Sequence, residues 1–389
     1  MVPISYNFRS LVVRKTTTIA AASGIALVVF VIASTLMLLH GVKQTMGAGG
    51  KRDNVVVMRK GADTEMSSSI EEPQIGLILA IPGVKKNEAG AGMGVGEVVV
   101  VVTQEKIGTE GGVSNVQIRG VPDNVMKFRP EVKIVEGRPA QPGTDEVIVG
   151  KRIRGRFKGV DLGGSFELKK NRTVKVVGVF EAAGSAHESE VWGDLDVVRQ
   201  SFGREGMVSS VRARLASPAA LDTFRLAVEQ DKQLGLQVER EDVFYEKQSQ
   251  GTSTFLGAIG IMIAVFFSMG AMIGATITMY AAVANRQREI GILRALGFTR
   301  LAILGSFLTE SILLALAGSV VGAFGSLGMG FVKISILNFQ SWSEIVLAFT
   351  PTPAILGKAM LLGGIMGVIG GFLPAIRAAR VSPVAAMRG

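Results

Sequence analysis

The chain has 389 residues, of which 48% are hydrophobic, 19% are charged and 49 are glycine, and its formal net charge is +10. With a mean hydropathy of +0.39, this composition argues against a purely soluble protein and fits membrane helices joined to a soluble part. The chain has no cysteine and only two histidines, which excludes a disulfide framework or a thiolate metal site and argues against a zinc centre or a histidine-based triad.

Four apolar segments are long enough to cross a bilayer, which takes about 20 apolar residues. They cover residues 16–40, 248–285, 301–332 and 354–376. The alternative for the first is a cleaved signal peptide. Its apolar run is longer than a signal core and no small-x-small cleavage site follows, so we expect an uncleaved anchor. The second is longer than one crossing needs, and we expect Ser249 to Thr254 to project from the membrane as a stalk.

Basic residues outside these segments indicate the orientation of the chain. Three stretches that carry arginine and lysine with almost no acid flank the spans, namely residues 1–15, 286–300 and 377–389. The positive-inside rule places all three in the cytoplasm, and therefore places residues 41–247 and 333–353 outside. Because the arginines lie at the ends of apolar runs and not on one soluble face among aromatics, nucleic-acid binding is not indicated.

The large outer segment, residues 41–247, has the pattern of a folded α+β domain. Runs of β-branched residues bounded by glycine or charge predict strands beginning near Asn54, Gly96, Val113, Asp145 and Arg172. Helical spacing is present in EEPQIGLILAIPGV and LDTFRLAVEQDKQL. We expect one domain or two subdomains, with KNEAGAGMGVGE as a mobile connection. The predicted fold class is therefore four transmembrane helices with a large α+β domain between the first and the second.

The sequence contains no convincing nucleotide site. A phosphate-binding loop needs G-x-x-x-x-G-K-[ST]. DEVIVGKR lacks the first glycine and has Arg152 where Ser or Thr would coordinate magnesium, and GAGMGVGE does not fit G-x-G-x-x-G. We expect no ATP or metal on this chain and no catalytic residue. His187, Glu188 and Glu190, in AGSAHESEVWGD, are either a ligand site or part of a surface loop, and the surface loop is the favoured interpretation.

Glu310 is an acid ten residues into the third span. Such residues are costly in a membrane and are functional candidates. It is either the partner of an arginine, from Arg300 or elsewhere in 286–300, or part of a substrate or proton relay; the ion pair is favoured. Glycines four apart allow close helix packing, within one chain or between two. They are Gly270 and Gly274, Gly318 and Gly322, and Gly363, Gly367 and Gly371.

The stretch NRQREIGILRALGFTR, from Asn285, predicts a short amphipathic helix. On a helical wheel we assign Ile290, Ile292, Leu293 and Leu296 to one half and Arg288, Arg294 and Ala295 to the other. Gly297 is a natural helix stop, and Thr299 can cap the next helix. Such a helix lies on the membrane with its arginines at anionic lipids, or docks its aliphatic ridge into a partner's groove.

These residues carry a family resemblance. RQREIGILRALGFTRLAILGSFLTESILLALAGSVVGAFG, from Arg286, resembles the signature of FtsX-like ABC transporter permeases. The C-terminal GFLPAIRAARVSPVAAMRG is similar to the end of that family, with Met387 where leucine is usual. In the outer segment, IPGV, VEGRPAQPGTDEVIVGKRI and RTVKVVGVFEAAGSAHESEVW resemble the MacB-type periplasmic core domain, and SYNFRSLVVRKTTT is similar to the family's lead-in to its first span.

The resemblance implies a half-transporter in the bacterial inner membrane that works as a homodimer or heterodimer. It implies a separate ABC ATPase in two copies, which would hold the ATP and magnesium, and a periplasmic adaptor and outer-membrane channel. Motion would pass from the ATPase along the first two spans to the outer domains, driving efflux or transport of lipoprotein, lipid or peptide. The implied coupling-helix residues are Arg288, Glu289, Ile290, Gly291, Leu293, Arg294, Ala295, Leu296 and Gly297.

Two alternatives stay open beside this transporter. One is a signalling permease that activates an outer hydrolase without moving cargo. The other is a membrane-anchored enzyme, against which the scarcity of histidine, the lack of cysteine and the missing nucleotide loop argue. MacB itself carries an ATPase domain on the same chain, whereas no such domain is expected here.

Overall fold

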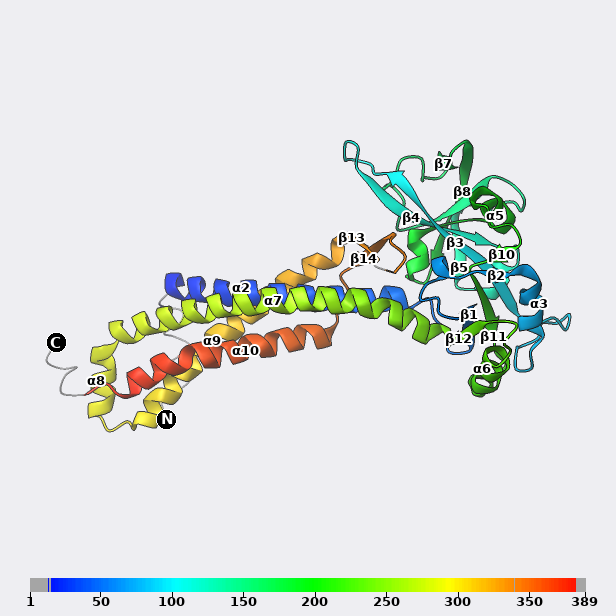
Figure 1. Cartoon of the computed structure of the whole chain (residues 1–389). Coiled ribbons are helices and arrows are strands. Elements are labelled where there is room, and N and C mark those ends of the chain that lie inside the picture. Colours follow the sequence, from blue (N-terminus) through cyan, green and yellow to red (C-terminus); the bar gives the residue numbers. More distant parts are fainter. Residues whose placement is uncertain (1–12, 14, 339, 383–389) are drawn as a thin grey trace. The chain divides into compact units, whose positions relative to one another are not determined.

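The computed structural model describes residues 13, 15–338 and 340–382 (Figure 1). Most of the lead-in 1–15 and the end of the tail 377–389 therefore lie outside the described residues. The chain divides into two compact units. The helical unit comprises Met1–Gly41, Phe255–Lys333 and Ala348–Gly389, and the α+β unit comprises Val42–Thr254 and Ile334–Leu347.

Four long apolar helices are present, as predicted. Among the described residues they are the candidates for membrane spans, by length and composition. They are α2 (Lys15–Gly47), α7 (Glu241–Asn285), α9 (Arg300–Ser326, continued by the 3-10 helix η4, Leu327–Phe331) and α10 (Pro353–Ala379). Helices α2 and α7 extend beyond the predicted apolar segments. Both helices continue into the polar residues that flank their apolar runs. Helix α7 begins with Glu241 and Asp242, and acidic residues are favourable at a helix N-terminus. The expected stalk, Ser249 to Thr254, lies inside α7.

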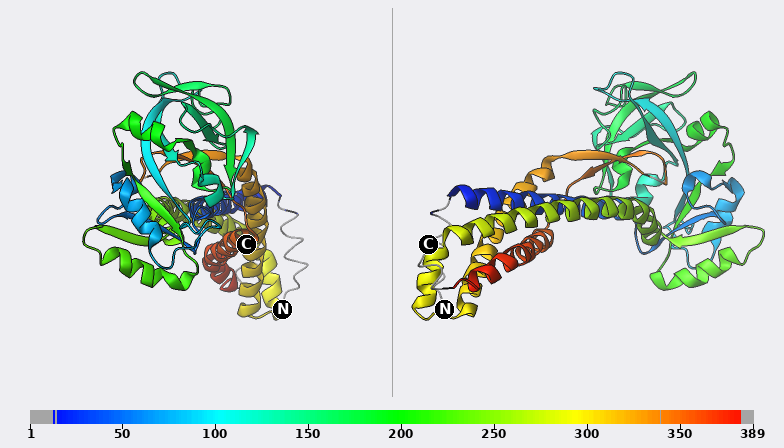
Figure 2. Two further views of the ribbon diagram at one scale, coloured as in Figure 1. Left: turned by 90° about the vertical axis from the view of Figure 1, so that its right-hand side faces the viewer. Right: turned by 60° about the vertical axis from the view of Figure 1, so that its left-hand side comes forward.

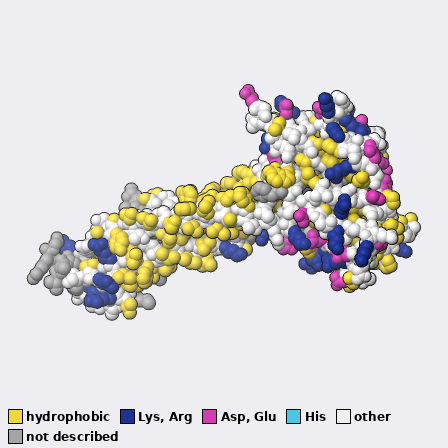
Figure 3. Space-filling model, in the orientation of Figure 1, with side chains coloured by type: hydrophobic (Ala, Val, Ile, Leu, Met, Phe, Trp, Pro, Cys, Tyr) yellow, Lys and Arg dark blue, Asp and Glu magenta, His cyan; other side chains and the backbone are white. Residues whose placement is uncertain are grey.

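The helical unit is held together by small and branched side chains. The right-hand view of Figure 2 shows its long helices lengthwise, and helices α2, α9 and α10 pack against one another. One apolar cluster joins Ile25 and Val29 of α2 to Ala315 of α9 and Ala359 of α10. Hydrophobic side chains cover most of the middle of the visible face of this unit in Figure 3, as expected for helices that face lipid.

The α+β unit is built on one ten-stranded mixed sheet in the order β12-β1-β11-β3-β4-β9-β6-β8-β5, with β7 paired to β8. Pairs β4–β9 and β6–β8 are parallel. The strands are β1 (Asn54–Arg59), β3 (Gly94–Glu105), β4 (Val113–Val121), β5 (Val132–Gly137), β6 (Glu146–Gly150), β7 (Ser165–Lys169), β8 (Arg172–Ala182), β9 (Glu190–Asp194), β11 (Ser210–Arg214) and β12 (Leu236–Arg240). The sheet is continuous, which favours one domain over two subdomains.

Smaller elements complete the α+β unit. Strands β2 (Ile70–Glu71) and β10 (Met207–Val208) pair with each other. The helices are α3 (Glu72–Ala80), α4 (Val125–Phe128), α5 (Leu195–Phe202) and α6 (Leu221–Glu229), with 3-10 turns η1 (Glu65–Ser67), η2 (Ala186–Ser189) and η3 (Pro218–Ala220). The five predicted strands and two predicted helices are confirmed.

Two segments contain more regular structure than the sequence predicts. The expected mobile connection KNEAGAGMGVGE ends as β3, because Gly94–Glu97 pair with Ala213–Ser210 of β11. The expected loop 333–353 contains a hairpin, β13 (Lys333–Leu337) and β14 (Glu344–Ala348). The runs KISIL and EIVLA have the β-branched composition of strands, so this signal was visible in the sequence.

Candidate functional site

The short helix between the second and third spans is present. Helix α8 covers Gln287–Ala295, Gly297 has a φ of 95°, and the Oγ1 of Thr299 accepts a hydrogen bond from the amide of Ala302 at 3.2 Å. The expected helix, glycine stop and threonine cap are therefore confirmed. Glycine is favoured at this stop because a side chain resists a positive φ.

The helical unit covers only part of the aliphatic half of α8. Ile290 is 1% exposed and packs with Met279, Val283 and Phe307, with Leu293 partly buried beside it. Ile292 and Leu296 are 48% and 72% exposed. At 100° per residue the four aliphatic residues fall within one half of the circumference, about 160° wide, as predicted, but burial is confined to the edge of that half at Ile290 and Leu293.

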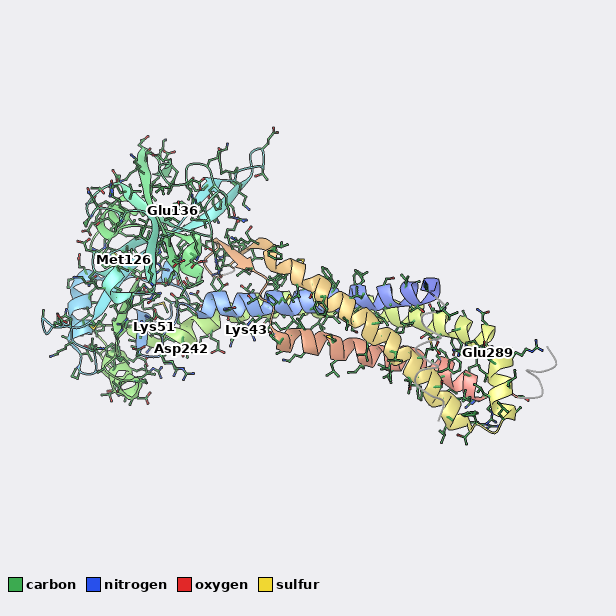
Figure 4. The ribbon with its side chains drawn as sticks, turned by 180° about the vertical axis from the view of Figure 1, so that it is seen from behind. Lys43, Lys51, Met126, Glu136, Asp242 and Glu289 are labelled. Atoms are coloured by element: carbon green, nitrogen blue, oxygen red, sulfur yellow. The ribbon has the colours of Figure 1, made fainter. Side chains whose placement is uncertain are left out.

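The outward face of α8 therefore combines apolar and charged side chains. Arg288, Glu289, Ala295 and Gly297 are exposed beside Ile292 and Leu296, whereas Gly291 is buried and Arg294 is half-buried. Figure 4 labels Glu289 on α8, where its side chain is 57% exposed. An exposed face of this kind is the type of surface that a helix presents to a groove with acidic and basic residues on its rim.

Glu310 lies in an ion pair inside the helical unit. Its Oε2 is 2.8 Å from Nη1 of Arg286, and each side chain is 5% exposed. The same guanidinium donates from Nε to Glu289 at 3.0 Å and lies 5.2 Å from the ring centroid of Phe307. A buried carboxylate needs such a partner because its desolvation is costly. The partner comes from the expected segment 286–300, and the pair ties the start of α8 to the middle of α9.

Five of the seven predicted packing glycines lie against a neighbouring helix. A Cβ at Gly318 or Gly322 would meet Ala22 O or Ala26 O of α2, at 2.5 and 2.2 Å. Gly363, Gly367 and Gly371 of α10 lie equally close to Ser319, Ala315 and Ser311 of α9. Close approach of this kind maximises helix packing in lipid.

Gly270 and Gly274 differ, since a Cβ at either would meet nothing within 4 Å. They line a groove of about 470 Å³ with Ala20, Gly24, Leu27 and Phe266. The groove lies between α2 and α7 and is lined almost entirely by apolar or small residues.

A cluster of buried charges occupies the centre of the α+β unit. Arg119 pairs with Glu65, Glu97 and Glu190 at 3.2, 2.8 and 2.8 Å. Arg212 pairs with Glu65 and Glu97, each at 2.8 Å, and with Glu241 at 3.1 Å. Arg129 pairs with Glu97 at 3.1 Å and Glu241 at 3.5 Å. We call these seven residues the charge cluster; no side chain in it is more than 7% exposed.

The arginines keep the carboxylates of the charge cluster ionised. Burial alone would raise the pKa of Glu97, but Arg129, Arg212 and Arg119 outweigh it and lower the pKa to about 2. For Glu65 the same competition holds the pKa well below the usual range. The ion pairs make the charge cluster a set of mutually compensating ions. Among the described residues no group of His, Asp and Glu is arranged to hold a metal ion.

The favoured surface-loop interpretation of AGSAHESEVWGD is wrong. His187, Glu188 and Glu190 are 3%, 0% and 5% exposed. Glu188 accepts the amides of Ala182 and Gly184, and Glu190 belongs to the charge cluster. The sequence signal for this burial is that Glu190 opens strand β9 directly before Val191 and Trp192, where alternate side chains turn inward.

His187 extends the charge cluster as a neutral base. Its Nε2 lies 3.3 Å from Nη1 of Arg129 and 3.2 Å from the hydroxyl of Tyr245, and its Nδ1 lies 3.2 Å from Glu190. Since Arg129 can only donate, Nε2 accepts and Nδ1 carries the proton toward Glu190. Burial is the largest cause that lowers the pKa of His187.

The charge cluster holds the first turn of α7. Glu241 is the first residue of that helix, and its carboxylate accepts hydrogen bonds from Asn54 Nδ2 at 2.8 Å and the amide of Lys51 at 3.3 Å, besides Arg212. One turn later, the hydroxyl of Tyr245 accepts from Nη2 of Arg212 at 3.1 Å. The start of α7 is thus fixed in the α+β unit by buried ionic hydrogen bonds, and its end meets the Arg286–Glu310 pair in the helical unit.

Comparisons with known proteins agree with this division. Residues 261–383 match the model of the FtsX-like permease C-terminal family, and residues 18–231 match the model of the MacB-like periplasmic core domain. The uncharacterized ABC transporter permease YvrN of Bacillus subtilis is 27% identical over 430 aligned residues, covering 99% of this chain and 98% of that protein.

Two further comparisons cover less of this chain. An uncharacterized ABC transporter permease of Methanocaldococcus jannaschii is 27% identical over 227 residues, which are 57% of this chain and 56% of that protein. The chain thus spans little more than half the length of that relative. The crystal structure of the periplasmic region of MacB from Actinobacillus actinomycetemcomitans is 10% identical, with a TM-score of 0.36, over 52% of this chain and 95% of that one.

The fold and these matches define a permease of ABC transporters, a multi-pass membrane protein with an α+β domain on its periplasmic or extracellular side. The chain belongs to the family that joins a MacB-like periplasmic core domain to an FtsX-like permease C-terminal region. The family resemblance carried by the sequence motifs is therefore confirmed.

Proposed function

We propose that this chain is the permease subunit of an exporter and that it transmits ATP-driven motion from a separate ATPase subunit to its α+β unit. ATP and magnesium would then belong to the partner. The outward face of α8, with Ile292 and Leu296 exposed beside Arg288 and Glu289, is the observation that carries the proposal. An apolar face that the described helices leave uncovered needs a partner or a lipid surface.

The test is co-purification of a polypeptide with a phosphate-binding loop and ATP hydrolysis by the complex. Leu296→Asp should weaken that association by about 30-fold or more, as expected for an interface anchor. Leu226→Asp is the matched control, because Leu226 is also an exposed leucine, on α6, and is 55% exposed. Equal ATPase recovery with wild type and Leu296→Asp would refute docking through α8. Recovery of a peptidoglycan hydrolase without an adaptor would favour the signalling alternative.

The proposed orientation has both termini and α8 in the cytoplasm of a bacterial cell with an inner membrane. The positive charge of residues 286–300 and of Arg377 and Arg380 supports it. Reporter fusions after Gly389 and at Gly184 should report opposite sides of the membrane. Activity of the same reporter at both positions would contradict this topology.

The permease is proposed to act as a dimer, with a second copy or a related permease against the α2–α7 groove. Helix α7 is the least covered span, with 6% of its most apolar window buried, against 33%, 39% and 44% for the others. Gly270 and Gly274 leave this surface open to close approach. A periplasmic adaptor and an outer-membrane channel complete the proposed exporter, whose cargo class is efflux substrates, lipids, lipoproteins or peptides.

A further inference from the structure

The hairpin β13–β14 is the connection between α9 and α10, yet its residues pack in the α+β unit. Glu344, Ile345, Val346 and Leu347 are 4%, 7%, 1% and 1% exposed. Connections between helices normally run over the surface with solvated backbone. The burial of β14 therefore indicates that the hairpin is specifically attached to the α+β unit.

An ionic contact closes this attachment. The carboxylate of Glu344 lies 2.6 Å from Nζ of Lys106 and 2.9 Å from Nη2 of Arg156, so that two cations share one anion. Arg156 also donates to the hydroxyl of Ser335 in β13. Charge-assisted hydrogen bonds of this length are the strong ones, and the partners come from two separate loops of the α+β unit.

Main-chain contacts hold the rest of the hairpin. The carbonyl of Val346 accepts from Nη1 of Arg152 at 3.1 Å, and its amide donates to Oγ of Ser189 at 3.1 Å. At the turn, Asn115 Nδ2 donates to the carbonyl of Trp342 at 2.8 Å. These hydrogen bonds satisfy backbone groups that would be exposed to water if the hairpin detached. The binding position in the α+β unit is therefore specific for this hairpin.

The segments that join the hairpin to the spans are short. Val332 alone separates η4 from β13, and residues 349–352 separate β14 from α10. A chain extends by at most about 3.6 Å per residue, so these connections allow little slack. Moreover, the amide of Thr350 donates to the carbonyl of Met37 in α2 at 3.4 Å.

We propose that β13–β14 is a clasp that attaches α9 and α10 to the α+β unit, closed by Glu344 between Lys106 and Arg156. The α+β unit is otherwise continuous with the membrane helices through α2 and α7 only. With the clasp closed, motion of the α+β unit is transmitted to α9 and α10 as well as to α2 and α7. The functional consequence rests on the proposed transmission of motion, whereas the attachment itself does not require an ATPase.

The experiment uses the full chain in nanodiscs, and the natural absence of cysteine allows two spin labels without background. One label replaces Thr173, exposed on β8, and the other replaces Lys358, exposed on α10. Glu344→Lys should broaden the distance distribution between these labels. Hydrogen exchange in peptides covering 334–348 should accelerate about tenfold or more, while exchange in β3 and β4 stays unchanged.

Glu136→Lys is the control, because it breaks an exposed pair with Arg154 in the same unit and should change neither measurement. The swap Lys106→Glu with Glu344→Lys should narrow the distribution again. If Glu344→Lys prevents folding, Glu344→Gln, which keeps the size of the side chain, should give a smaller acceleration of exchange. An unchanged distribution and unchanged exchange in folded Glu344→Lys or Glu344→Gln would overturn the clasp. ATPase co-purification should be unaffected, so failure of α8 docking is recognised separately.

Discussion

The two units of this permease treat charge in opposite ways. The α+β unit contains 30 basic and 30 acidic residues, whereas the helical unit contains 12 basic and 2 acidic residues and so carries the whole net charge of the chain. The α+β unit buries seven ions against one another. The helical unit packs through glycine, alanine and serine, and its described ion pairs centre on Arg286, with Glu289 and Glu310.

The difference teaches how each unit obtains a specific arrangement. In water, apolar burial drives folding. A buried ionic network then restricts which arrangement the folded chain adopts, because each ion must meet its partner. In lipid, apolar side chains gain little from leaving their solvent, so close backbone approach and a few polar contacts decide which helices meet. Each unit is therefore most sensitive to a different kind of substitution.

The largest expected effect is in the charge cluster. Arg212→Met leaves Glu65, Glu97 and Glu241 short of a positive partner and should lower the free energy of unfolding by about 3–5 kcal/mol. Thermal unfolding of the full chain in detergent, followed by the near-UV signal, measures it. Arg138→Gln, at an exposed pair with Glu146, should cost about 0–1 kcal/mol. Equal costs for the two variants would mean that burial does not distinguish the ion pairs.

The second largest expected effect is a loss of stability in the helical unit, and substitutions at two glycines are compared. Gly322→Leu places a side chain where a Cβ already lies 2.2 Å from Ala26 O, and should destabilise the packing of α9 on α2 by about 1–3 kcal/mol. Gly274→Leu meets open space and should leave the stability of the single chain unchanged. Thermal unfolding measures both. Light scattering on the same samples shows whether Gly274→Leu alters association, which the proposed dimer requires.

The smallest expected effect is a loss of stability of the α+β unit in acid. The pKa of His187 is lowered in the folded chain. Below pH 6.5 the unfolded chain therefore binds a proton at His187 that the folded chain does not bind. As the pH decreases, the free energy of unfolding decreases by up to about 1.4 kcal/mol per pH unit. Glu97, with a pKa of about 2, contributes stability that is present above pH 4.5 and lost as pH falls toward 2. His187→Gln should remove the first loss and retain the second. Retention of both in urea titrations would exclude His187 as the source.

Local sequence signals predicted which helices and strands are present better than they predicted the tertiary contacts of individual side chains. The four spans, the stop at Gly297 and the cap at Thr299 follow from residues adjacent in the chain, and they are present. The segment AGSAHESEVWGD favours a surface loop for His187 and Glu190, yet both are buried. Their burial depends on Arg119 and Arg129, which are 58 to 71 residues away in the sequence. No local pattern contains such a partner.

The amino-acid sequence by itself determined that this protein is a four-span membrane permease with an α+β domain after its first span. Hydrophobic length, charge flanks and short motifs are properties of consecutive residues and need no neighbours in space. Only the tertiary structure decided that Ile292 and Leu296 face outward on α8, that Glu310 pairs with Arg286, and that β14 lies buried in the α+β unit. Each of these depends on which distant side chains supply contact, charge or hydrogen bonds.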